Sequence, residues 1–511
     1  MTVRLDRRGF LGSAVSLSAM LSMPWPARAA QAIGFDEARH LLSRASFGAT
    51  PTEIQSFAGL DYSEAVDRLL ASPHREALTP APRWVNEALK AVREEQREAV
   101  EKLRAAGNDK QLAAGIVRPI QEQGRELRNW WVEEMLVTDQ PLVERMTLFW
   151  HNHFTSSLQK VRFAPALYFQ NALFRREALG NFANLLKAVA RDPAMLIYLD
   201  GVRSVARQPN ENFGRELLEL FTLGEGHYSE TDIKAAARAF TGRSIDPVTG
   251  SFAEHVQQHD GGEKTFLGRT GRFDGDDIIA LLLNDPHTAE TVVRKLWLEF
   301  VSLAPDAAEI ARLAAVFRTG GYEIRPLMRA MFLSPAFRDP ASRGGLIKSP
   351  VDLIVGTVRL LGLPAPEKTG LVRMLQGLGQ VPFDPPNVKG WAGGESWIST
   401  YTLLLRQQFL RRMVETTTVS SMDGGMMMGP ALLDRRADRK QQMPPEQRPV
   451  EGRSLRNAGG EAKLGPTLAG VDQAALLRTL LPRAPIDGVD VTAPPGAVVA
   501  QALLDSAYQL K

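Results

Sequence analysis

The sequence predicts a mainly α-helical protein: a large multi-helical domain with long loops and at most a small β-hairpin. Over most of the chain, apolar residues recur every three or four positions with charged residues between them, which is the spacing of an amphipathic helix. The alternation with a period of two that is typical of strands is scarce. Helix-end signals also occur, such as Gly224 after a helical run and Ser229 with Asp232 in a capping-box pattern.

The first thirty residues have the features of an export signal. Arg7 and Arg8 precede an apolar run that ends at Met23, and residues 27–29 read Ala-Arg-Ala. This order is typical of secretory signals, and the paired arginines resemble the twin-arginine address. An ordinary secretory signal or an uncleaved anchor is the alternative. We expect the twin-arginine translocase to export the chain, residues 1–29 to be removed, and the mature protein to be periplasmic or secreted.

Composition narrows the classes of partner and ligand. The chain has a formal net charge of +3 and no cysteine. Four arginines and one aspartate within residues 1–29 account for all of that charge, so the mature chain is near neutral and gives no argument for a nucleic-acid partner. Without thiolates, any metal is held by histidine, carboxylate, amide or carbonyl groups. No later stretch is long and apolar enough to span a bilayer.

The helical pattern continues in order along the predicted core domain, residues 30–415. It covers residues 87–103, 121–136, 182–190, 212–223, 232–240, 275–283, 288–301, 307–318, 325–333, 351–361, 369–378 and 400–414. Residues 264–268 and 271–273 predict a small hairpin. Residues 416–470 contain glycines, methionines, charges and prolines, which is typical of a flexible linker or insertion. Residues 471–511 are helical again, and we expect them to pack on the core.

Histidine is scarce, with eight in the chain, and two of them share the hexapeptide FWHNHF. His151 and His153 could bind one ion from extended or helix-end backbone, whereas in a regular helix their directions diverge by about 200°. Glu144 lies two helical turns before His151. We therefore consider His151, His153 and Glu144, with His259 from a glycine-containing loop, as ligands of a divalent metal ion. The alternative is that these are core histidines among aromatic residues.

A second polar group lies in the segment NENFGRELLELF. Asn212, Glu216 and Glu219 are spaced i, i+4 and i+7, so they form one stripe on a predicted helix that is otherwise strongly apolar. Buried carboxylates need a cation, and Arg215 and Arg145 are the candidates. The functional interpretation is a charged site in which Glu216, Glu219, Asp200 and Arg215 are catalytic and Asn212 binds. The alternative is a solvated face with salt bridges.

Two tryptophans follow a rigid segment late in the chain. Trp391 ends the sequence PPNVKGW, and Trp397 comes six residues later. They predict either a substrate-binding platform or a packed surface loop. The motifs G-x-S-x-G and H-E-x-x-H and a glycine-rich phosphate loop do not occur, so the common hydrolase, zincin and nucleotide-binding signatures give no support.

Together these segments resemble a bacterial family catalogued as domain of unknown function 1800. The similar segments are HLLSRASFG (40–48), ERMTLFWHNHF (144–154), DPAMLIYLD (192–200), residues 210–224, 237–242, 264–268 and 347–350, and NVKGW (387–391). The helix from Val498 resembles the family's usual ending. The resemblance implies a large, exported, helical protein whose gene often lies beside one for a sulfatase-like family, domain of unknown function 1501. It implies no established reaction.

Two functions therefore remain open. The first is a metal-assisted, hydrolase-like enzyme that acts on envelope or extracellular material, with histidine ligands and a carboxylate base. The second is a non-catalytic partner or maturation factor for the sulfatase-like protein, in which the charged clusters are structural ion pairs. Geometry separates them: convergence of the histidines and carboxylates favours the enzyme, whereas separate ion pairs favour the partner.

Overall fold

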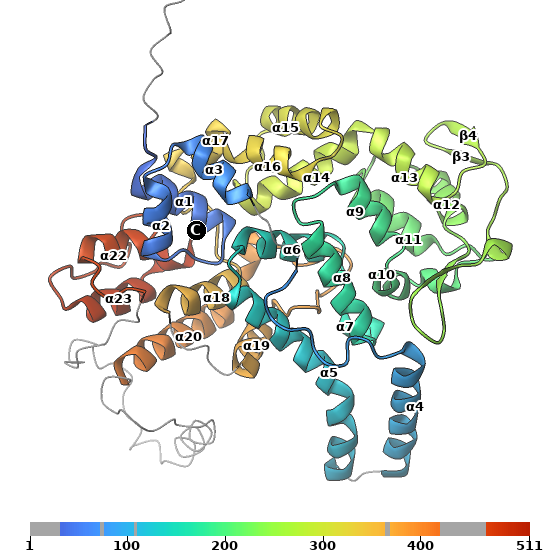
Figure 1. Cartoon of the computed structure of the whole chain (residues 1–511), viewed down its shortest axis with the longest axis horizontal. Helices are drawn as coiled ribbons and strands as arrows, with labels where there is room; N and C mark the ends of the chain where they lie inside the picture. Colours follow the sequence, from blue (N-terminus) through green and yellow to red (C-terminus); the bar gives the residue numbers. More distant parts are fainter. Residues whose placement is uncertain (1–30, 72–75, 107–109, 363–367, 420–466) are drawn as a thin grey trace, which may run out of the picture.

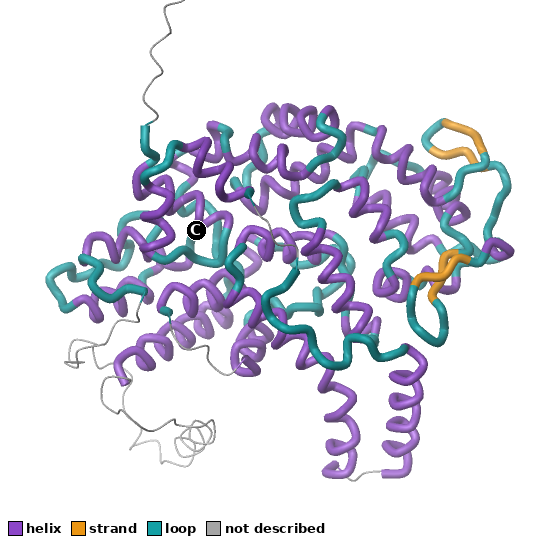
Figure 2. Tube along the Cα trace, viewed as in Figure 1, coloured by secondary structure: helices purple, strands orange, loops and turns teal. Residues whose placement is uncertain are grey.

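The structure is a computed structural model that describes residues 31–71, 76–106, 110–362, 368–419 and 467–511. The predicted signal and most of the predicted linker lie outside these residues. Within them the fold is helical with two small antiparallel sheets (Figure 2), so the predicted fold class is confirmed. None of the helices in these ranges is long and apolar enough to cross a membrane.

The amino-terminal part contains three short helices and one long helical pair. These are α1 (Gly34–Ala45), α2 (Pro51–Ala58), α3 (Tyr62–Leu70), α4 (Leu89–Ala106) and α5 (Lys110–Val137). Capping boxes at Thr50 and Asp61 satisfy the first amides of α2 and α3. The helix α4 runs beside the first half of α5, and this pair projects from the rest of the molecule (Figure 1).

The helix α6 (Pro141–His153) is the most buried element that carries a predicted site. All of its residues except Pro141 and Asn152 are buried, and it packs against α8, α1 and α5. The helices that follow are α7 (Leu158–Val161), α8 (Ala164–Arg176), α9 (Phe182–Val189) and α10 (Pro193–Tyr198). Because α6 is enclosed, its charged and polar side chains need partners from neighbouring helices.

The segment with the polar stripe departs from a regular helix. After the 3₁₀ turn η1 (Gly201–Arg203), α11 (Glu211–Glu216) continues into a π-helix, η2 (Leu217–Phe221), where the sequence predicted one helix over residues 212–223. Gly224 follows with a positive φ of 84°. The helix α12 (Glu230–Ala239) then begins with the predicted capping box of Ser229 and Asp232.

Two small sheets follow α12. The strand β1 (Arg243–Ile245) pairs antiparallel with β2 (Phe252–Glu254), and after the 3₁₀ turn η3 (Val256–Gln258) the strand β3 (Lys264–Phe266) pairs with β4 (Arg269–Gly271). The second pair is the predicted hairpin, with Lys264 opposite Gly271, although its second strand lies at 269–271 and not at the predicted 271–273. The first pair was not predicted.

The carboxyl-terminal half closes the core onto α1. Its elements are α13 (Gly275–Asn284), α14 (Pro286–Phe300), α15 (Ala307–Thr319), α16 (Ile324–Phe332), α17 (Pro335–Arg338), η4 (Pro340–Ser342), α18 (Pro350–Leu361), α19 (Lys368–Gly377), η5 (Gly394–Trp397), α20 (Thr400–Val419), α22 (Gln473–Leu480), α23 (Pro495–Leu504) and η8 (Ser506–Gln509). The helix α23 packs on α20, and Leu510 forms a β-bridge with Ile347. One cluster of buried apolar residues extends from Ala38 to Tyr508.

Candidate functional site: a carboxylate cluster beside the carboxyl end of α6

Asn152, at the end of α6, fixes the segment that contains Trp391. Its Oδ1 accepts a hydrogen bond from the Trp391 amide at 2.7 Å, and its Nδ2 donates to the Trp391 carbonyl at 3.3 Å. Gly390 has a φ of 78°, and a Cβ there would lie 2.2 Å from Asn152 Oδ1, so only glycine fits. Thr155 donates to the Val388 carbonyl at 2.7 Å. These contacts hold the backbone on both sides of residue 389.

Lys389 connects this loop to the π-helix. Its Nζ lies 3.3 Å from Glu219 Oε1 and 3.1 Å from Glu225 Oε1. Tyr228 donates from its hydroxyl to Glu219 Oε2 at 3.2 Å. The structure therefore brings together the FWHNHF motif, the polar stripe and the PPNVKGW loop, which lie far apart in the sequence.

The carboxyl end of the π-helix is held by side chains from α14 and α6. Lys295 donates to the Leu220 carbonyl at 2.7 Å, and Thr291 donates to the Leu223 carbonyl at 3.0 Å. His153 Nε2 lies 3.3 Å from the Phe221 carbonyl. Helix ends leave carbonyls without intrahelical partners, and these three side chains supply the donors.

One tautomer of His153 satisfies both of its ring nitrogens. Nε2–H donates to the Phe221 carbonyl, and Nδ1 accepts from Lys295 Nζ at 3.2 Å. Burial, together with the charge of Lys295, holds the pKa of His153 well below its usual value. Burial also lowers the pKa of Lys295 to about 8. His153 is therefore neutral and supports the π-helix, and the lone pair of its Nδ1 already accepts the hydrogen bond from Lys295.

His151 and Glu144 have different surroundings from those expected of metal ligands. His151 is fully buried against the rings of Trp131, Phe383 and Trp391. Neither of its ring nitrogens has a hydrogen-bond partner among the described residues, and burial lowers its pKa to about 3. Glu144 is buried and forms an ion pair with Arg175.

His259 lies apart from α6, on the loop after η3, where its Nδ1 is 3.0 Å from the Thr241 carbonyl. Across the described ranges, no three His, Asp or Glu side chains are placed to hold one metal ion. The four expected ligands, His151, His153, Glu144 and His259, therefore do not form one site. The two α6 histidines diverge because both lie within regular helix.

The charged residues around Glu216 are paired with one another. Asp200, in left-handed backbone with a φ of 59°, accepts from Lys160 Nζ at 2.7 Å and from Asn212 Nδ2 at 3.4 Å. Arg215 binds both oxygens of Glu230, at 2.8 and 2.9 Å. These pairs are partly exposed, so this part of the site lies at the protein surface.

Glu216 differs from these neighbours. Its carboxylate makes no hydrogen bond and no ion pair with the described residues, although it is partly buried. Burial and then the charge of Glu219 raise the pKa of Glu216, while Lys389 and Arg215 act in the opposite direction. Burial raises the pKa of the nearby Tyr198, and the charge of Glu216 raises it further. Glu216 is thus a carboxyl group that favours its protonated form more than an exposed glutamate does.

Trp391 and Trp397 are core residues. Their exposed fractions are 6% and 8%, so neither presents an open ring face for a ligand. This placement favours the packed loop over the substrate platform. The residues that the sequence analysis missed are basic or phenolic: Lys160, Lys389, Lys295, Tyr198 and Tyr228. Only Lys389, in NVKGW, and Tyr198, in DPAMLIYLD, lay within segments that had been singled out.

The fold and this cluster define a large helical protein with a half-buried carboxyl group among ion-paired residues at its surface. A family model described as "Protein of unknown function (DUF1800)" matches residues 40–506. The chain belongs to this family, which confirms the resemblance seen in the sequence. No curated protein and no solved structure gave a significant match.

Proposed function

We propose that this protein is an exported acid–base enzyme of the hydrolase type, acting on envelope or extracellular material, with Glu216 as the proton donor. The observation that carries the proposal is the contrast between Glu216 and its neighbours. Glu219 and Asp200 each have a lysine partner, whereas Glu216 has none within the described part of the chain and lies in a partly desolvated position. A general acid must keep its proton near the working pH, and desolvation beside a second carboxylate has that effect.

The other residues have supporting roles in this proposal. Asp200 is the accessible carboxylate that activates a water molecule or stabilises positive charge, and Asn212, which is exposed beside it, binds substrate. Glu219 raises the pKa of Glu216. Arg215 holds Glu211 and Glu230 at the rim. The proposed reaction uses no metal ion, because the described histidines and carboxylates do not converge on one point.

Replacing Glu216 by glutamine is expected to lower the hydrolytic rate by at least about 100-fold, the usual contribution of a positioned general acid. The assay measures release of reducing ends and free amino groups from purified cell envelope. Glu211→Gln, one turn earlier on α11 and paired with Arg215, is the matched control and should keep full activity. Equal activity of the Glu216 variant and wild type would remove Glu216 from the reaction.

A second test of Glu216 needs no substrate. A ¹³C NMR titration should find the pKa of Glu216 above 4.5, and Lys389→Met should raise it further because the lysine charge lowers it. A normal or lower value in wild type would contradict the proposed acid, whatever the substrate.

Export is part of the proposal and rests on the arginine pair near the start of the sequence. The double variant Arg7→Lys/Arg8→Lys should leave nearly all of the precursor in the cytoplasm, because the translocase reads the paired arginines. Arg4→Lys, outside the pair, is the control. Cell fractionation and immunoblotting measure the distribution, and unchanged export of the double variant would point to the general secretory route.

A second candidate is a non-catalytic partner or maturation factor for a sulfatase-like protein encoded nearby. The observation that favours it is an apolar surface on α20, where Tyr401 is 63% and Leu404 is 56% exposed, beside a groove of about 630 Å³ that Ile398 and Leu403 help to line. Exposed apolar surfaces mark interaction sites. If wild type and Glu216→Gln are equally inactive on every substrate, this function replaces the first.

A further inference from the structure

A second charged cluster, separate from the carboxylate cluster, lies where α1, α18 and the last residues of the chain meet. Six cationic side chains interact electrostatically there, and all are buried except Lys348, which is partly exposed. They are Arg39, Arg44, Arg145, Lys348, Arg406 and Lys511. The carboxylates that face them are Asp352 and Glu299, and the charge of Asp36 also acts on Arg39. Counting side chains, the cluster has more positive than negative charge.

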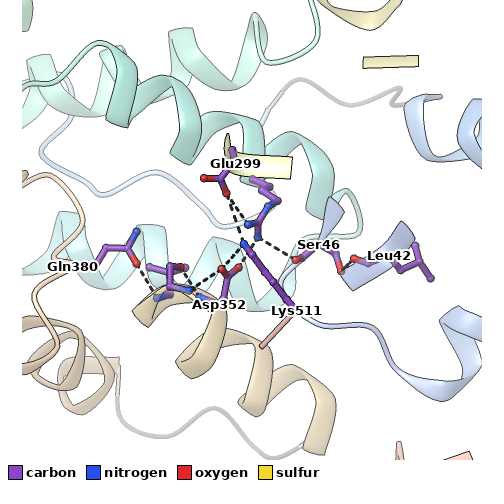
Figure 3. A network of polar contacts seen from close by, with 9 residues as sticks. Leu42, Ser46, Glu299, Asp352, Gln380 and Lys511 are labelled. Carbon is purple, nitrogen blue, oxygen red and sulfur yellow. Dashed lines mark hydrogen bonds and ion pairs between the residues drawn. The ribbon is translucent and has the colours of Figure 1, made fainter. Parts of the chain in front are cut away.

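Both carboxylates are already used by two of the cations. Arg145 donates to Asp352 Oδ1 at 2.5 Å and to Glu299 Oε1 at 2.6 Å. Lys511 Nζ lies 2.6 Å from Asp352 Oδ2 and 3.8 Å from Glu299 Oε1. Figure 3 shows the Lys511 side chain directed at Asp352, with Glu299 on the other side of the network. This half of the cluster is electrically balanced.

The three remaining arginines have only neutral partners among the described residues. Arg39 donates from Nε to the Thr479 carbonyl at 3.2 Å, and Arg44 donates to the Ser342 carbonyl at 2.6 Å. Arg44 Nε and Nη1 and Arg406 Nε have no hydrogen-bond partner in the ranges that the structure describes. Arginine does not give up its proton in proteins, so these charges persist, and a buried charge without a counterion is costly.

Lys348 is the fourth cation without a carboxylate. Its Nζ lies 3.4 Å from the centre of the Tyr508 ring and makes no hydrogen bond or ion pair with the described residues. Burial and the charge of Arg39 are the main causes that hold the pKa of Lys348 well below its ordinary value. An ammonium group over a ring is stabilised only partly, so a further anion would be favourable here.

A cavity of about 40 Å³ lies between these groups. Its lining includes Arg39, Lys348, Lys511 and Asp352, with the hydroxyl-bearing Ser43 and Tyr508. By the same measure one water molecule needs roughly 10–15 Å³. The cavity therefore has room for about three such molecules, which corresponds to an anion with three or four oxygen atoms.

We propose that this cavity binds a small oxyanion, either free inorganic phosphate or sulfate or the phosphate or sulfate group of a larger molecule. Arg39 and Lys348 are its contacts, since both line the cavity and neither forms an ion pair with a described residue. Lys511 is the third cation of the lining, but its charge is shared with Asp352 and Glu299. The site is independent of Glu216 and of the proposed hydrolysis, so either proposal can fail without the other.

The test is thermal unfolding of the mature protein with increasing inorganic phosphate, at constant ionic strength set with sodium chloride. Wild type should show a rise in melting temperature that grows with the logarithm of the phosphate concentration and reaches about 3 °C at one hundred times the dissociation constant. Lys348→Met should lose most of this rise. It should also melt no lower than wild type without phosphate, because an unpaired ammonium is replaced by an apolar chain of similar length.

Arg312→Met is the matched control, since Arg312 is an exposed arginine on α15 that pairs with Glu309, and it should keep the full response. Arg39→Gln tests the second contact. A sugar phosphomonoester separates the two sources: stabilisation by it as well as by phosphate indicates the end group of a larger molecule, and stabilisation by phosphate alone indicates the free ion. Equal responses of wild type and Lys348→Met, or none in wild type, would overturn the proposal.

Discussion

Asp352→Ala is expected to destabilise the protein by about 3–5 kcal/mol, the usual cost of removing one partner from a buried ion pair. Asp352 is 6% exposed and is the common partner of Arg145 and Lys511. Burial alone would raise its pKa, but these two cations outweigh burial and hold the pKa of Asp352 well below its usual value. Without the carboxylate, a cluster that already has excess positive charge loses its main compensation.

Urea denaturation of the mature protein measures this effect. Asp67→Ala is the control, because Asp67 forms a comparable arginine pair with Arg329 at an exposed position and should lose only about 0–1 kcal/mol. If the two variants lose the same free energy of unfolding, the buried network contributes no more to stability than a surface ion pair does. The excess positive charge of the cluster would then not affect stability.

The free energy of unfolding is expected to fall steeply when the pH is lowered from 6.5 towards 4. Burial lowers the pKa values of His40 and His151 to about 3 and that of His153 well below 6.5. In the unfolded chain these histidines bind protons near pH 6.5, whereas in the folded chain they stay neutral. Their contribution is therefore complete above pH 6.5 and is lost as the pH falls, by about 1.4 kcal/mol per pH unit for each histidine.

Asp192 works in the opposite direction over the same range. Burial raises its pKa to about 7, so the folded protein holds this proton while the unfolded chain, with a pKa near 3.9, does not. Its stabilising contribution is present at low pH and is lost as the pH rises from about 3.9 to 7. His40 and His151 opposed by one aspartate leave a net loss of about 1.4 kcal/mol per pH unit on acidification, and His153 adds to the loss in the same direction.

Chemical denaturation at several pH values measures this slope. His151→Phe should reduce it by about 1.4 kcal/mol per pH unit, because one buried histidine no longer resists protonation. Phe174→Leu, which alters a ring packed beside His151, is the control and should lower stability without changing the slope. If His151→Phe had the same slope as wild type, His151 would be protonated in the folded protein much as it is in the unfolded chain.

The sequence was sufficient for the fold class because α6, α12 and their neighbours follow rules that act over a few residues. Apolar periodicity predicted the helices, and the capping box of Ser229 and Asp232 is present as expected. The metal hypothesis required His151 and His153 to lie in helix-end or extended backbone. Local sequence does not decide between that conformation and a regular helix. The helix continues through His153, so the two rings point to different surroundings.

Partners from distant segments could not be predicted in the same way. Glu144 is neutralised by Arg175 on α8 rather than by its sequence neighbour Arg145, which instead binds Asp352 and Glu299. Lys389 lies more than 160 positions from Glu225 in the sequence, yet the two form an ion pair. Each pair depends on tertiary packing between distant segments, which local patterns in one sequence do not reveal.

The π-helix at Leu217–Phe221 sets where the residues within its turn point. A π-helical turn contains one residue more than an α-helical ladder requires. Deleting Leu217 or Leu218 would restore the regular ladder and move Glu219 one position closer to Glu216, out of its place opposite Lys389, while the residues on both sides of the turn stayed nearly in place. A family member could thus keep every polar residue of the cluster and still lose its arrangement through the loss of a single leucine, a change that a comparison of polar residues alone would overlook.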